Sequence, residues 1–212
     1  MIKASYAILL DGGFVTKKHF AANRRAATAD DVVRVCDRLR RLPEVADYEL
    51  LRIYYYDAYP SSQTVEQPIT GVRHALAETP RFRQSQSLFD ELELKSGFAL
   101  RMGDTALAPD PWRLKPRVIR QLKSQPRPLV DKDFELAISQ KGVDMRVGMD
   151  MARLALREMV RTIVVVTSDS DFVPAFKFVR REGVKVVLVT LGHKGVRREL
   201  RVHADVTVDT LD

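Results

Sequence analysis

The stretch that decides the fold is TIVVVTSDSDFVPAF, Thr162–Phe176, in which an apolar run is followed at once by two aspartates. The run is short and rich in β-branched residues, which is typical of a strand buried on both faces of a parallel sheet. Pro174 suits the first turn of the helix that we expect next. Asp169 and Asp171 therefore lie at the mouth of a buried strand. Two carboxylates there lose hydration and repel each other unless a cation or hydrogen bonds stabilise them.

Similar apolar runs along the chain predict an α/β protein. We expect further strands at 6–10, 48–57, 134–140, 184–190 and 206–208, and helices at 28–42, 143–159, 174–183 and 195–204. After the first strand, Asp11 and two glycines predict a sharp turn, and Thr28 is a candidate cap for the next helix. This alternation indicates a three-layer α/β/α sandwich with a mostly parallel central sheet. Ligands of such sheets bind beyond the carboxyl ends of the strands, where Asp11, Asp169 and Asp171 all fall.

The middle of the chain has a looser pattern. Between Tyr59 and Asp133, proline, serine and glutamine interrupt a helix expected at 81–97 and a short strand expected at 98–103. We therefore expect one domain over residues 1–212 that carries a variable insertion at about 59–133.

Four aspartates carry the candidate chemistry: Asp11, Asp144, Asp169 and Asp171. Any one alone could be a turn residue or a helix cap, which stabilises by about 0.5–2 kcal/mol. A cap needs one side chain, so the second aspartate of the SDSD stretch remains unexplained unless something else binds there. Carboxylates that converge without histidine or cysteine form a hard oxygen site, which suits Mg²⁺ or Mn²⁺ better than zinc. Asp150 ranks second because it is not an i+3 or i+4 partner of Asp144 on the helix.

Three stretches resemble the NYN domain of the LabA-like group, within the PIN-like nuclease superfamily. They are AILLDGG at 7–13, QKGVDMRVGMDMARLA at 140–155 and IVVVTSDSDFVPAFKFVRREGVKVVLV at 163–189. The resemblance implies a PIN-like fold and a metal-dependent nuclease site, with the four aspartates at the acidic positions of the family. The family often has asparagine where this chain has Phe14. The supporting polar contact is therefore either missing or supplied by another residue, such as Ser168.

The function that these residues favour is hydrolysis of phosphodiester bonds by a ribonuclease that uses bound Mg²⁺ or Mn²⁺. Asp11 and Asp171 are the first candidates for direct ligands, and Asp144 and Asp169 are further ligands or water-mediated partners. The alternative is a catalytically silent RNA-binding or regulatory module on the same fold, which the departure at Phe14 favours.

The net charge of +7 favours a polyanionic partner, such as single-stranded or structured RNA. The stretch WRLKPRVIRQLKSQPR at 112–127 has six basic residues and no acidic residue. Its tryptophan could stack on an unpaired base, or it could anchor the segment on the core. Three further basic residues, Lys141, Lys194 and Arg197, are expected near the acidic positions. Each could either contact a phosphate or face solvent. The candidates for substrate contacts are Trp112, Arg113, Arg117, Arg120, Lys141, Lys194 and Arg197.

Other features of the sequence argue against two further classes of enzyme and indicate where the protein is located. A phosphatase of the haloacid dehalogenase type would need an aspartate at Gly13, and the sequence has no G-x-x-x-x-G-K-[ST] loop. Met1 to Leu10 lacks the pattern of a signal peptide, and the longest apolar run is too short to span a bilayer, so we expect a cytoplasmic protein without membrane contact. Cys36, the single cysteine, is expected to be buried on a helix. Pairing into a homodimer stays open.

Overall fold

The computed structural model describes residues 4–211, and its centre is a seven-stranded sheet with the order β6-β5-β2-β1-β7-β8-β9. The strands are β1 (Ser5–Asp11), β2 (Glu49–Ala58), β5 (Phe98–Leu114), β6 (Phe134–Lys141), β7 (Thr162–Val166), β8 (Lys185–Val189) and β9 (Val206–Val208). Neighbouring strands run parallel, except that β5 and β6 pair antiparallel. The predicted mostly parallel sheet is confirmed.

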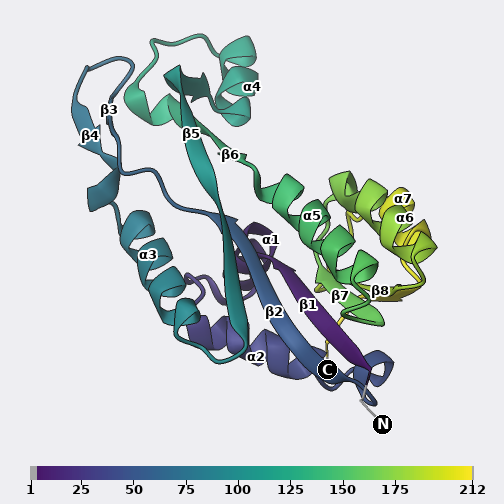
Figure 1. The fold of residues 1–212 in the computed structure, drawn as a ribbon. Helices are drawn as coiled ribbons and strands as arrows, with labels where there is room; N and C mark the ends of the chain where they lie inside the picture. The colour runs from purple at the N-terminus through teal and green to yellow at the C-terminus, as the bar shows by residue number, and fades with distance from the viewer. Residues whose placement is uncertain (1–3, 212) are drawn as a thin grey trace.

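Helices cover both faces of this sheet (Figure 1). One layer contains α1 (Gly12–Asn23), α2 (Ala29–Leu39) and α3 (Pro80–Glu93), and the other contains α5 (Val143–Leu156), α6 (Val173–Arg181) and α7 (Arg198–Val202). Successive residues of β1 point to opposite layers, with Ile8 and Leu10 packed in the first and Ala7 and Leu9 in the second. The two apolar clusters, one on each face, confirm the predicted three-layer sandwich.

The strand predicted from the apolar run, β7, is an interior strand of the sheet. β7 lies between β1 and β8, and every one of its residues is buried. Each valine or isoleucine buried in this way contributes about 1.5–3 kcal/mol relative to an exposed side chain. The position of the two aspartates after this strand is therefore fixed by one of the most deeply packed parts of the protein.

Helix α1 is the main element that the sequence pattern did not predict. In place of a simple turn, the helix begins at Gly12, because the Asp11 carboxylate accepts the N–H of Phe14 and caps it. A side chain at Gly12 is not tolerated, since its Cβ would lie 2.6 Å from the ring of Tyr55. The next helix matches the prediction, with Thr28 as the cap of α2 and Cys36 buried on it.

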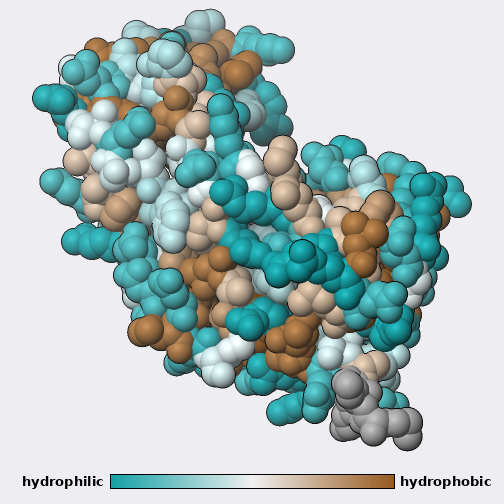
Figure 2. Space-filling view, viewed as in Figure 1, coloured by the Kyte–Doolittle hydropathy of each residue, from teal (hydrophilic) through white to brown (hydrophobic). Residues whose placement is uncertain are grey.

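An arm extends from one end of the sheet, and β5 forms its axis (Figure 1). The prediction of a short strand at 98–103 was wrong in length, because β5 pairs with β2 as far as Gly103 and then with β6 from Asp104 onward. We define the arm as residues 59–79 and 104–141, which include β3 (Thr64–Glu66), β4 (Arg73–Ala75) and α4 (Pro116–Ser124). The space-filling view shows a recess between the arm and the lobe of α5 to α7 (Figure 2).

The segment 59–133, expected as an insertion, is thus divided between the core and the arm. Leu88, Phe89 and Leu92 of α3 pack in the first apolar layer, and the first part of β5 pairs with β2. Short 3-10 helices complete the chain: η1 (Pro43–Val45), η2 (Leu76–Glu78), η3 (Asp131–Asp133) and η4 (Ser170–Phe172). Across residues 4–211, we find no helix with the length and apolar character that crossing a membrane requires.

Candidate active site

Asp11 lies at the carboxyl end of β1, in the middle of the acidic edge. Its Oδ1 accepts the Phe14 N–H at 2.9 Å, and its Oδ2 accepts the Thr167 hydroxyl at 2.9 Å. Burial raises the pKa of Asp11, the two hydrogen bonds oppose this, and the carboxylates of Asp169 and Asp144 raise the pKa further. Net destabilisation of the negative charge at Asp11 makes this a position where a cation would bind favourably.

Thr167 organises the turn that follows β7. Its buried hydroxyl donates to Asp11 and accepts the N–H of Asp169 at 3.1 Å. Asp169 in turn caps η4 by accepting the Asp171 N–H at 2.9 Å. The SDSD stretch is therefore a capped turn in which Asp169 is held in place. Capping accounts for Asp169 but leaves the exposed carboxylate of Asp171 without an ion-pair partner within residues 4–211.

Asp144 reaches the same edge from the first turn of α5. Its side chain is largely exposed, and its carboxylate forms no ion pair in the described part of the chain. Partial burial raises the pKa of Asp144, and the negative charges of Asp169 and Asp171 raise it further. The four predicted aspartates therefore lie close enough for their charges to affect one another's pKa, although they come from three separate parts of the sequence.

Asp57 is a fifth carboxylate at this edge, which the sequence pattern did not single out. It lies near the carboxyl end of β2, and its Oδ1 accepts the Ala58 N–H at 2.8 Å and the Gln140 amide at 2.9 Å. Burial raises the pKa of Asp57 and the charge of Asp11 adds to this, while the hydrogen bonds oppose it. The signal was available, because Asp57 also closes a parallel strand, as Asp11 does.

The second-tier candidates, Asp150 and Ser168, have different surroundings. Asp150 is buried on α5, where it accepts two hydrogen bonds of 2.9 Å from Arg101 and one of 3.1 Å from Tyr56. Its charge is therefore compensated by its own arginine. The hydroxyl that supports the acidic edge comes from Thr167 and not from Ser168.

Phe14, at the place of the family asparagine, belongs to the core. It is 8% exposed, and its ring meets that of His193 edge-on with centroids 5.8 Å apart. This contact joins α1 to the loop after β8. The same loop carries Arg197, whose guanidinium donates to the Ser170 hydroxyl at 3.2 Å, so one predicted basic residue stands beside the acidic turn. Lys194, in the same loop, is exposed.

The basic candidates of the arm make structural contacts or face solvent. Trp112 donates its indole N–H to the carbonyl oxygen of Glu66 at 2.6 Å and so joins β5 to the β3–β4 hairpin. This contact favours the anchoring role over base stacking. Arg113 pairs with Glu135 at 3.0 Å across β5 and β6. The remaining basic candidates are exposed: Arg117 and Arg120 on α4, and Lys141 at the end of β6.

The donor chemistry of the acidic edge fits a divalent cation with a preference for oxygen. All its candidate ligands are carboxylates, and Asp144 and Asp171 have accessible oxygens. Within residues 4–211, however, no three histidine, cysteine or acidic side chains lie close enough together to form a finished metal centre. Asp11 and Asp169 are held by hydrogen bonds, whereas the carboxylates of Asp144 and Asp171 accept none in the part of the chain that the structure describes.

The three-layer sandwich is the fold that the resemblance to PIN-like nucleases implied. The chain belongs to the NYN domain family, which matches residues 103–211. The matched range contains Asp144 and the SDSD turn, whereas Asp11 precedes it. The family resemblance read from the sequence is therefore confirmed.

Two further similarities concern proteins without an assigned function. The chain is 33% identical over 61 residues to an uncharacterized protein of Methanocaldococcus jannaschii, and the match covers 29% of this chain and 25% of the archaeal protein. A crystal structure of a protein of unknown function from Vibrio parahaemolyticus is similar over 98% of this chain and 94% of its own, with a TM-score of 0.52 and 18% identity. At that identity the similarity shows the fold alone.

Proposed function

We propose that the protein is a metal-dependent ribonuclease that hydrolyses phosphodiester bonds at the edge formed by Asp11, Asp144, Asp169 and Asp171. The observation that carries the proposal is the convergence of these carboxylates, because the Thr167 hydroxyl joins Asp11 to the turn of Asp169. The negative charges of Asp169 and Asp144 also act to raise the pKa of Asp11, and those of Asp169 and Asp171 act on Asp144 in the same way. Membership of the NYN family supports the same chemistry, because this is a family of PIN-like nucleases.

The four aspartates would hold Mg²⁺ or Mn²⁺, which when bound would polarise the scissile phosphate and lower the pKa of the attacking water. The protein's own side chains and backbone hold the reacting groups in place. Asp11 is fixed by the Phe14 N–H and the Thr167 hydroxyl, so its carboxylate keeps one orientation at the end of β1. Arg197 projects from the opposite loop beside Ser170, where its guanidinium can bind a phosphate oxygen and orient the substrate.

A second candidate function is a silent RNA-binding or regulatory module. Two observations favour it: Phe14 replaces a polar residue with a core side chain, and the described carboxylates do not form a ready-made metal centre. Both the nuclease and the silent module would bind RNA, but only the nuclease would cleave it.

The test is cleavage of a labelled single-stranded RNA with Mn²⁺ or Mg²⁺ by the wild type, Asp11→Asn and Asp171→Asn. Asp47→Asn is the matched control, since Asp47 is exposed in the turn before β2, at the opposite edge of the sheet. We expect Asp11→Asn and Asp171→Asn to lose at least about 100-fold in rate, Asp47→Asn to behave as the wild type, and EDTA to stop the reaction. Equal cleavage by all four proteins would overturn the proposal, and RNA binding without any cleavage would establish the silent module.

A further inference from the structure

A groove of about 1180 Å³ runs between α1, α3 and the arm. Its lining includes Gly13 and Asp57, which adjoin Asp11 in sequence or in the sheet, so the groove opens onto the acidic edge. Pockets for small ligands are typically about 300–1,000 Å³ and well enclosed. An open groove of this size suits an extended polymer better than a small molecule.

The walls of the groove carry positive charge that the protein does not neutralise. Lys17 from α1, Arg24 at the C-cap of α1 and Arg81 from the first turn of α3 are exposed on it. In the part of the chain that the structure describes, none of the three forms an ion pair with a carboxylate. Arg25 and Arg113 also line the groove, but they pair with Asp31 and Glu135. Three uncompensated cations in one groove favour a polyanion.

Aromatic side chains lie between these cations. Phe20 is 53% exposed on α1, and Phe82 is half-buried on α3, directly after Arg81. Phe20 lacks the packing that normally covers a phenylalanine of a helix. Alternating cations and open aromatic faces are the arrangement by which proteins bind single strands, because unpaired bases stack on the rings while phosphates meet the cations. A duplex keeps its bases stacked inside and cannot use the rings.

We propose that the groove binds a single-stranded nucleic acid, with phosphates at Lys17, Arg24 and Arg81 and an unpaired base on Phe20. The strand leaves the groove past Gly13 and Asp57 toward the acidic edge. The direction of the strand rests on the proposed nuclease function, whereas binding in the groove does not. Of the basic stretch 112–127, only Arg113 lines this groove, and it is paired with Glu135. The tryptophan of that stretch is engaged with the β3–β4 hairpin.

The experiment measures binding of a labelled unstructured RNA 12-mer by fluorescence anisotropy, in EDTA so that no cleavage occurs, over a series of salt concentrations. The variants are Lys17→Gln/Arg24→Gln/Arg81→Gln, Phe20→Ala and Phe20→Trp. The matched control for charge is Arg38→Gln/Arg41→Gln/Arg52→Gln, whose arginines are exposed at the end of α2, in the turn after it and on β2, and do not line the groove. Circular dichroism confirms that each variant is folded.

We expect the triple groove variant to flatten the slope of log K against log salt by about 2, since each phosphate contact on a single strand contributes about 0.7. Phe20→Ala should bind about tenfold more weakly at an unchanged slope, and Phe20→Trp should restore binding. RNA and DNA single strands should both bind, and the matching duplex should bind at least about tenfold more weakly. An unchanged slope in the triple variant, wild-type affinity of Phe20→Ala, or equally tight duplex binding would each overturn the proposal. Groove binding without cleavage in Mn²⁺ would instead overturn only the nuclease function.

Discussion

At the scale of single residues, Thr167 is the side chain on which the acidic edge depends. Thr167→Val removes its hydroxyl at nearly constant volume, so the Asp169 N–H and one oxygen of Asp11 lose their partner. We expect the free energy of unfolding to fall by about 1–2 kcal/mol. Thr167→Ser keeps the hydroxyl and serves as the control in urea unfolding followed by circular dichroism. Equal stability of the two variants would show that these hydrogen bonds contribute nothing.

Asp150 offers a contrasting residue, because its contacts predict a role in stability and none in catalysis. Asp150→Ala leaves the partly buried guanidinium of Arg101 without its two hydrogen bonds. We expect a loss of about 2–3 kcal/mol in the free energy of unfolding, discounted because Arg101 keeps some contact with water. If the protein cleaves RNA, the rate per folded molecule should stay within about twofold of the wild type. A large loss of cleavage rate in a variant of unchanged stability would show that Asp150 does take part in catalysis.

The sequence could predict which aspartates follow strands, but not what each one meets. Asp11, Asp169 and Asp171 were found because a parallel sheet gathers the carboxyl ends of its strands. Asp57 obeys the same rule, because it ends the strand predicted at 48–57, yet the sequence pattern did not single it out. The role of Thr167 depends on β1 and β7 being neighbours in the sheet, and a single sequence does not show which strands are neighbours. Its two contacts could therefore be seen only in the structure.

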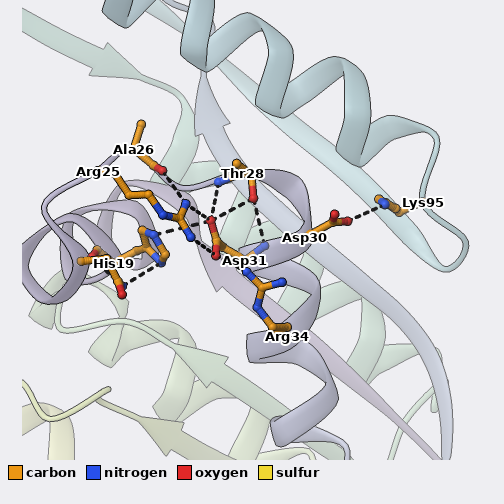
Figure 3. A network of polar contacts seen from close by, with 9 residues as sticks. His19, Arg25, Ala26, Thr28, Asp30, Asp31, Arg34 and Lys95 are labelled. Atoms are coloured by element: carbon orange, nitrogen blue, oxygen red, sulfur yellow. Dashed lines mark hydrogen bonds and ion pairs between the residues drawn. The ribbon is translucent and has the colours of Figure 1, made fainter.

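At the scale of elements, the start of α2 is an electrostatic unit built around Asp31 (Figure 3). The carboxylate accepts hydrogen bonds from Arg25 and from the N–H and hydroxyl of Thr28, and Arg34 also binds it. The Arg25 hydrogen bonds, followed by those of Thr28 and Arg34, hold the pKa of Asp31 far below its usual range against the effect of burial. A pKa lower in the folded than in the unfolded protein means that this stability is present above about pH 4 and is lost as the pH falls below it.

Asp31→Asn should therefore lower the free energy of unfolding at pH 7 by about 2–3 kcal/mol. It should also flatten the loss of stability between about pH 5 and pH 2, because the group that takes up a proton on unfolding is gone. Asp37→Asn is the control on the same helix, where the carboxylate is 48% exposed and 3.8 Å from Arg40, and we expect a change within about 0.5 kcal/mol. Urea unfolding across this pH range checks the prediction. Parallel acid slopes for the wild type and Asp31→Asn would contradict it.

The elements that the sequence predicted are those with a clear apolar pattern, either along the whole strand or on one face of the helix. β7 and β8 are apolar at nearly every position, and α5 has Val147, Met151 and Leu154 buried on one face. α1 escaped prediction because it buries only its first turn and has no apolar stripe. The length of β5 escaped because Pro109 and Pro111 read as breakers. In the structure they lie within the irregularity between Leu107 and Trp112, where the pairing with β6 is interrupted and no amide is needed.

At the scale of the whole molecule, the sandwich and the arm differ in how many side chains they bury, and they are joined at the base of the arm. The sandwich has an apolar layer on each face, whereas the arm has an antiparallel pair and short elements that bury few side chains. β5 and β6 carry the connection, and α5 starts directly after β6 with Asp144 in its first turn. The position of Asp144 therefore depends on how closely β5 and β6 approach each other at the base of the arm.

Gly103 sets that approach, because it is the last residue of β5 paired with β2 before the strand turns to β6. A Cβ at Gly103 would lie 2.5 Å from the carbonyl oxygen of Lys141 and 2.8 Å from a methyl group of Val143. Gly103→Ala must push β6 and the start of α5 outward, and we expect a loss of about 1–3 kcal/mol in the free energy of unfolding. Gly148→Ala is the matched control in α5, since nothing lies within 4 Å of its Cβ, and it should gain about 0.5–1 kcal/mol from helix propensity. Thermal and urea unfolding of both variants check the pair. A Gly103→Ala protein as stable as Gly148→Ala would mean that the arm and the start of α5 move apart at no cost.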